Sequence, residues 1–147
     1  MTFMTWVKDQ QKNLKDSISR FKNKEFMDAV VAGCALVAAA DGNIDSSEKQ
    51  KMAGFIGRSE ELRVFDINHV IERFNYFVSS FEFDAVIGKG EALKAISKIR
   101  NDSEASSLLI RVCSAIGSAD NNFDEHEQQV VREICHHLNL NPSEFHL

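Results

Sequence analysis

Apolar residues recur along this chain at the three- and four-residue spacing of amphipathic helices. The pattern predicts helices over residues 25–40, 46–57 and from Asp66 to about Ser80. Further helices are predicted around Ile87–Ile99, up to the Ser118 region and from Asp124 to Leu138. Clusters of β-branched residues at period two, which would predict strands, are missing. We therefore expect an all-α fold, a compact bundle of about seven helices joined by short connections.

The apolar faces of these helices define the predicted core. Asp66 is expected to cap the long helix, and Phe145 is expected to anchor the C-terminal turn. The remaining expected core residues are Phe26, Val30, Val31, Cys34 and Val37; Ile67, Val70, Ile71, Phe74, Phe77 and Val78; Leu108, Leu109, Val112 and Cys113; and Val130, Val131, Ile134 and Leu138.

Charge divides the chain into two parts. Residues 1–25 carry six Lys or Arg against three acids, and the rest is strongly acidic because the whole chain has a net charge of −5. Residues 1–20 are predicted to be an amphipathic or flexible segment. This segment either lies on an anionic membrane surface or packs as a frayed helix on the body. Residues 21–147 are predicted to form one helical domain. Its acidity disfavours nucleic acid as a partner.

An internal repeat is the most specific feature of the sequence. Asp41-Gly-Asn-Ile-Asp-Ser-Ser-Glu48 and Asp120-Asn-Asn-Phe-Asp-Glu-His-Glu127 share one pattern: Asp at the first and fifth positions, Asn at the third, a large apolar residue at the fourth and Glu at the eighth. The two copies lie 79 residues apart, and the same offset aligns Cys34 with Cys113. The sequence therefore predicts that one helix–loop–helix unit occurs twice.

Two interpretations of the repeat remain open. In the first, Asp45 and Asp124 cap helices while a Glu three residues later completes a capping box. That interpretation leaves Asp41 and Asp120 unexplained, because each follows the negative C-terminal end of a predicted helix. In the second, the oxygens converge on a divalent cation, for which calcium is favoured, although the position of the Glu excludes an EF-hand proper. The candidate ligands are Asp41, Asn43, Asp45, Glu48, Asp120, Asn122, Asp124 and Glu127.

Other chemistry finds little support in the sequence. The three cysteines are widely spaced without a CxxC pair, so neither a disulfide framework nor a zinc site is predicted. No arrangement of catalytic residues and no nucleotide-binding loop is recognisable, so we expect no enzyme activity and no organic cofactor. No stretch reaches the roughly 20 apolar residues of a membrane span, and the N-terminus lacks the order of a secretory signal. A cytoplasmic location is expected.

Several stretches resemble the TerB family of tellurite-resistance proteins. They are Phe21–Met27, Ala39–Gly42, Ser47–Met52, Ser59–Asp66, Phe81–Asp84, Ile87–Glu91, Ser118–Asp120, Asn122–Asp124 and Asn141–Phe145. The resemblance implies an all-helical fold of two pseudo-symmetric halves. It also implies a cytoplasmic stress-response protein that acts with the integral membrane protein TerC at the inner membrane face. It further implies metal binding by the acidic residues of the repeat, and Glu82, Asp84 and Glu91 could extend that acidic surface.

These observations lead to one main hypothesis and two alternatives. The main hypothesis is a non-enzymatic, divalent-metal-binding interaction module of the tellurite-resistance system, with a TerC-like membrane protein and other ter-system proteins as partners and with peripheral membrane contact. The first alternative is direct handling of tellurite by thiolates of Cys34, Cys113 or Cys135, which requires exposed thiols of low pKa. The second is a metal-independent scaffold whose acidic face meets a basic partner.

Overall fold

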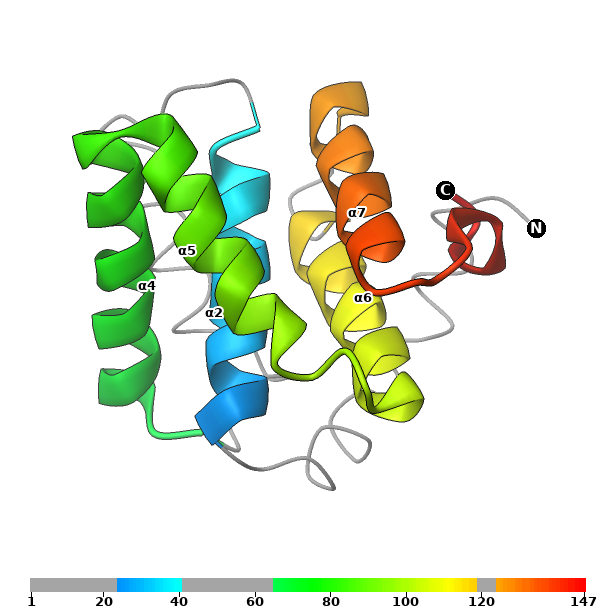
Figure 1. Ribbon diagram of the computed structural model, residues 1–147, viewed down its shortest axis with the longest axis horizontal. Helices are drawn as coiled ribbons and strands as arrows, with labels where there is room; N and C mark the ends of the chain where they lie inside the picture. The colour runs from blue at the N-terminus through cyan, green and yellow to red at the C-terminus, as the bar shows by residue number, and fades with distance from the viewer. Residues whose placement is uncertain (1–23, 41–64, 119–123) are drawn as a thin grey trace.

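A computed structural model describes residues 24–40, 65–118 and 124–147, and this part of the chain is entirely helical (Figure 1). The elements are α2 (Lys24–Ala38), α4 (Ile67–Phe83), α5 (Ala85–Ser97), α6 (Ser103–Ser118), α7 (Glu125–His137) and the short 3-10 helix η2 (Pro142–Phe145). The predicted all-α class is confirmed. The segment 1–20 and the helix predicted over 46–57 lie outside the described residues, so the expected total of seven helices stays a prediction.

Helix α2 is the centre of the bundle. It contacts α4, α5, α6 and α7, and every residue from Phe26 to Val37 is buried. In Figure 1, α2, α4 and α6 run in one direction, while α5 and α7 run in the opposite direction. The C-terminal ends of α2, α4 and α6 therefore lie at the same end of the bundle as the N-terminal ends of α5 and α7. We call this the upper end, as it is oriented in Figure 1.

Most of the predicted core is confirmed, with two errors on α4. Val70, Phe74 and Phe77 are at most 1% exposed, but Ile67 and Ile71 are 41% and 36% exposed. Ile67 occupies the first turn of the helix, and Ile71 lies at the edge of the apolar stripe that meets α2 and α5. Spacing alone predicts which face of a helix is apolar, whereas burial also depends on how far the neighbouring helices extend.

The connection between α4 and α5 is a single residue, Asp84. The sequence predicted that the long helix ends near Ser80, whereas α4 continues to Phe83. Asp84 has an extended backbone, and its carboxylate accepts hydrogen bonds from the amides of Val86 and Ile87 at 2.8 and 3.1 Å. Because these amides have no partner within the helix, Asp84 starts α5 immediately after α4 ends.

A buried acid fastens α2 to the neighbouring helices. Asp28 of α2 is 7% exposed, and Arg73 of α4 donates from Nε to its carboxylate at 3.0 Å. The guanidinium also lies 4.5 Å from the ring centre of Tyr76, whose hydroxyl donates to Glu91 of α5 at 3.1 Å. This hydrogen bond to Glu91 is the main reason that the pKa of Tyr76 is raised. The chain of contacts joins α2, α4 and α5 on one side of the bundle.

Candidate functional site

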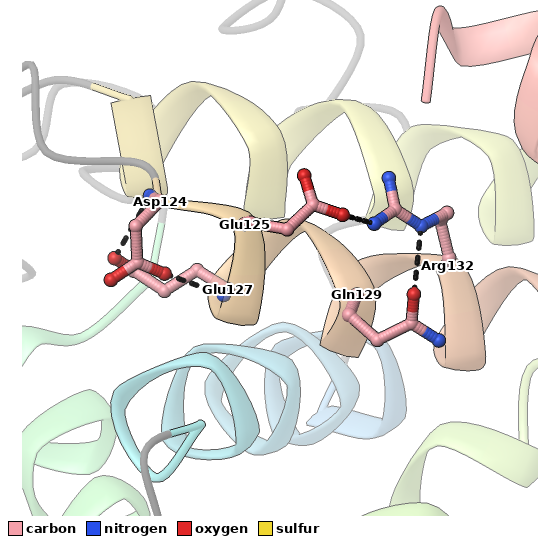
Figure 2. Close-up of polar contacts among 5 residues, drawn as sticks. All are labelled: Asp124, Glu125, Glu127, Gln129 and Arg132. Atoms are coloured by element: carbon pink, nitrogen blue, oxygen red, sulfur yellow. Dashed lines mark hydrogen bonds and ion pairs between the residues drawn. The ribbon is translucent and has the colours of Figure 1, made fainter.

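The second copy of the acidic repeat begins α7 with a complete capping box (Figure 2). Asp124 accepts a hydrogen bond from the backbone amide of Glu127 at 2.8 Å, and the Glu127 carboxylate accepts one from the amide of Asp124 at 3.4 Å. The capping interpretation of Asp124 and Glu127 is therefore confirmed. These two carboxylates are also brought together at the start of a helix, where the positive end of the helix dipole favours negative charge.

A third acid at this helix start is neutralised within α7. Glu125 forms an ion pair with Nη2 of Arg132, and Nε of Arg132 donates to Gln129 at 3.0 Å (Figure 2). Glu125 is not part of the repeated pattern. Arg132 thus compensates the additional acid, and neither of its printed contacts is made with Asp124 or Glu127.

The helices that precede the two copies of the repeat are equivalent in sequence position and contact each other. Shifting the bounds of α2 by 79 residues gives 103–117, and α6 spans Ser103–Ser118. The thiols of Cys34 and Cys113, which align in the repeat, are hydrogen bonded to each other across this contact. A Cβ placed on Gly33 would lie only 2.6 Å from Sγ of Cys113, so the sulfur packs against the α2 backbone. The glycine thus permits a close approach of the two helices.

This contact brings the starting points of the two repeats to the same end of the bundle. Helices α2 and α6 run in the same direction, and both end at the upper end (Figure 1). Asp41 follows directly after the α2 terminus, and Asp120 follows the α6 terminus by two residues. Neither helix has a basic residue in its last turn. The negative ends of two helix dipoles therefore precede the first Asp of each copy without a basic residue of their own last turn.

Six of the eight candidate ligands lie outside the described residues, namely Asp41, Asn43, Asp45, Glu48, Asp120 and Asn122. Within residues 24–40, 65–118 and 124–147, no group of three or more His, Cys, Asp or Glu is arranged to hold a metal ion. A cation site built on Asp124 and Glu127 thus requires further ligands from the repeats themselves.

The described pair of carboxylates is chemically compatible with a divalent cation. Capping engages Oδ1 of Asp124 and Oε1 of Glu127, whereas a carboxylate offers two oxygens and about four lone-pair sites. Asp124 is exposed, so its carboxylate is accessible from solvent. Oxygen ligands of this kind suit hard cations such as Ca²⁺. The capping and metal interpretations therefore do not exclude each other at this position.

The acids proposed to extend this surface have separate structural roles. Asp84 caps α5 at the upper end, and the adjacent Glu82 is exposed there. Glu91 lies further along α5 and accepts the hydrogen bond of Tyr76. Sequence patterns did not reveal that Phe83 and Val86, beside the first two acids, are about four-fifths exposed.

All three cysteines are buried and in the free thiol form. The hydrogen bond with Cys34, together with burial, raises the pKa of Cys113 well above its ordinary value. Burial raises the pKa of Cys135 to about 12. The reactive form of cysteine is the thiolate, which needs a low pKa and access to the reagent. These properties disfavour the tellurite-reducing thiol alternative.

Known proteins connect this fold to a family. The profile described as "Tellurite resistance protein TerB" matches residues 27–147. A curated relative named "Tellurium resistance protein TerB", from Alcaligenes sp, is 49% identical over 102 residues, which cover 69% of this chain and 84% of the relative. No solved structure matches the chain significantly. Among the described helices, none combines the length and apolarity needed to cross a membrane. The profile match and the close relative show that the chain belongs to the TerB family and has a role in tellurite resistance.

Proposed function

We propose that this chain is a non-enzymatic interaction module of tellurite resistance whose state responds to a divalent cation, with calcium as the favoured ion. The main support is the common direction of α2 and α6, because it starts both acidic repeats from one end of the bundle (Figure 1). Ligands from both copies would hold the ion: Asp41, Asn43, Asp45 and Glu48 with Asp120, Asn122, Asp124 and Glu127.

Helix electrostatics support a positively charged ligand at the upper end. The helices α2, α4 and α6 all end there, and none has a basic residue in its last turn. An acid follows each terminus: Asp41, Asp84 and Asp120. A carboxylate near a helix C-terminus is unfavourable by about 0.3–1 kcal/mol. A bound cation or a basic partner would remove this repulsion at several helix ends at once.

Cation binding would act on the protein by stabilising its native state. Because the ligands come from segments 79 residues apart, the unfolded chain would bind the ion more weakly than the folded chain. At a free ion concentration of about 100 times Kd, the native state would gain roughly 2.7 kcal/mol. The chemistry that the ion supplies is charge neutralisation, which would change the surface that partners meet.

The proposed partner is a TerC-like integral membrane protein, together with other proteins of the ter system. This partner comes from the family resemblance, and the relative from Alcaligenes carries a name that refers only to tellurium resistance. The module would meet it at the cytoplasmic face of the inner membrane. The basic N-terminal segment could add peripheral contact with anionic lipid.

Thermal unfolding tests the metal part of this proposal. The melting temperature of the metal-stripped protein is expected to rise by several degrees in millimolar calcium. The double variant Asp41→Ala/Asp120→Ala should lose this rise. Asp66→Ala, which removes a helix cap outside the repeats, should lower the melting temperature and keep the calcium response. The absence of a response to calcium, magnesium, manganese and zinc in the native sequence would contradict metal binding.

The capping box favours one second candidate, a metal-independent acidic docking scaffold. Asp124 and Glu127 satisfy backbone amides of α7 without any ion, so the repeat has a structural use of its own. In that case, binding of a basic partner should weaken steeply with salt and be unaffected by chelators. Partner binding measured with EDTA and with calcium separates the two functions.

A further inference from the structure

The corner between α4 and α5 carries the most exposed large apolar side chains of the described residues. Phe83 and Val86 are 81% and 80% exposed, and the adjacent Ile87 is 48% exposed. By contrast, most apolar residues of α2, α6 and α7 are buried. Three neighbouring apolar side chains in solvent are typical of a surface that another molecule covers. We call these three residues the apolar corner.

The apolar corner is held rigidly. Only Asp84 separates the two helices, and its carboxylate caps the first turn of α5, which carries Val86 and Ile87. Gly88 is buried one residue later, where an added Cβ would lie 2.6 Å from the backbone of Phe81. The last turn of α4 and the first turns of α5 are thus pressed together. A surface with fixed backbone loses little conformational entropy when it binds.

The charges around the apolar corner are negative. It lies at the C-terminal end of α4, which has no basic residue in its last turn. Glu82 and Asp84 flank Phe83, and both are exposed. The basic residue Lys89 is directed elsewhere, because its Nζ lies 3.3 Å from the carboxylate of Glu133 on α7. An occupant must therefore combine apolar anchors with positive charge.

We propose that the apolar corner binds a basic amphipathic segment of a partner protein, with Phe83 and Val86 as the central contacts. Apolar side chains of the segment would cover these two residues, and its Lys or Arg side chains would face the α4 terminus and the flanking carboxylates. This inference names a contact surface for the interaction role proposed above and rests on that role. It does not require a metal ion.

The same charges argue against two other occupants. In a symmetric dimer through this corner, two α4 C-termini and two pairs of carboxylates would face each other, which is repulsive. An anionic membrane surface would likewise be repelled by Glu82 and Asp84. A basic protein segment is the occupant that satisfies both the apolar and the electrostatic requirement.

Synthetic peptides provide the test. The probe is an amphipathic helix of about 18 residues, or five turns, built from Leu and Lys, and its matched control has Glu in place of every Lys. Binding is measured by fluorescence anisotropy in EDTA at low salt. The native protein should bind the Lys peptide and not the Glu peptide. Phe83→Ser and Val86→Ser should each weaken binding about 10- to 30-fold.

Matched variants keep this test specific. Ile67→Ser removes a 41% exposed apolar residue at the opposite end of α4 and should leave peptide binding unchanged. All three variants should keep the native circular dichroism spectrum, because the replaced side chains are largely in solvent. The proposal is overturned if the native protein ignores the Lys peptide, if the Glu peptide binds equally well, or if Phe83→Ser has no effect.

Two further outcomes would assign the corner to another occupant and so contradict the proposal. One is Phe83-dependent dimerisation measured by light scattering. The other is Phe83-dependent binding to vesicles of anionic lipid without binding to the Lys peptide. Because the peptide assay contains EDTA, its failure alongside a calcium response leaves the metal proposal intact, and peptide binding without a calcium response has the opposite meaning.

Discussion

The close contact between α2 and α6 predicts an unusual response to Gly33→Ala. In an exposed helix interior, replacing Gly with Ala stabilises a protein by about 1 kcal/mol, because Ala has the higher helix propensity. At Gly33, however, the added Cβ would lie 2.6 Å from Sγ of Cys113 and 3.8 Å from Cδ1 of Leu109. Nonbonded heavy atoms pack best at about 3.5–4.0 Å. The sulfur must therefore move by about 1 Å, or the helices must separate.

The expected magnitude follows from these opposing effects. The sulfur is buried and hydrogen bonded to Cys34, so it cannot shift without breaking that contact. Overpacking of this kind costs about 1–3 kcal/mol. With a cost near 2.5 kcal/mol and a helix-propensity gain near 1, Gly33→Ala should destabilise the protein by roughly 1.5 kcal/mol. That loss corresponds to a decrease in melting temperature of about 3–6 °C.

A double-mutant cycle measured by urea unfolding isolates the contact. Cys113→Ala removes the sulfur and should cost about 1 kcal/mol on its own. In that background, Gly33→Ala should become stabilising by about 0.5–1 kcal/mol, which gives a coupling energy near 2 kcal/mol. Gly90→Ala is the control, since an added Cβ there meets nothing within 4 Å. If Gly33→Ala stabilises the protein as Gly90→Ala does, whether or not Cys113 is present, the packing of α2 against α6 is refuted.

Three further predictions follow from the described residues. Gly88→Ala should cost about 3 kcal/mol or more, because its Cβ would meet the backbone of Phe81, which cannot rotate away; urea unfolding beside Gly90→Ala measures the difference. Asp124→Ala should cost about 1 kcal/mol in EDTA through loss of the helix cap, and a larger cost in calcium would support its role as a ligand. The pKa of Cys135 is raised from 9.0 to about 12, so the native state holds this proton more strongly than the unfolded chain. The stability that it contributes is complete below about pH 9 and is lost as pH rises toward 12, with a slope of roughly 1.4 kcal/mol per pH unit that Cys135→Ala should remove.

Local patterns in the sequence predicted the helix starts and much of the core. Asp66 and Asp124 were recognised as caps, because an oxygen-bearing side chain before an apolar periodic run satisfies the free amides of a helix. The repeat was also informative, since its offset superimposes the bounds of α2 on those of α6. Such features depend on residues that are near each other in the sequence, and are therefore visible before the fold is known.

Features that depend on packing between distant segments were not predictable. Gly88 was interpreted as weakening its helix, whereas its missing side chain allows contact with Phe81. Ile67 was expected in the core and is exposed, because no periodicity reveals where a neighbouring helix ends. The contact of Cys34 with Cys113 likewise follows from the arrangement of two helices. For the candidate site, the sequence predicted the residue types and the described structure adds the capping box and the shared direction of the helices.

Calorimetric titration of the metal-stripped protein with calcium tests the central claim most directly. The native sequence, the isosteric variant Asp41→Asn/Asp120→Asn and the control Asp66→Asn should be compared at one ionic strength. The account predicts saturable binding in the native protein and in Asp66→Asn, and its loss in the double variant, because only that variant removes charge from both repeats. Absence of binding in the native protein, or equal binding in all three, would contradict metal binding by the repeats.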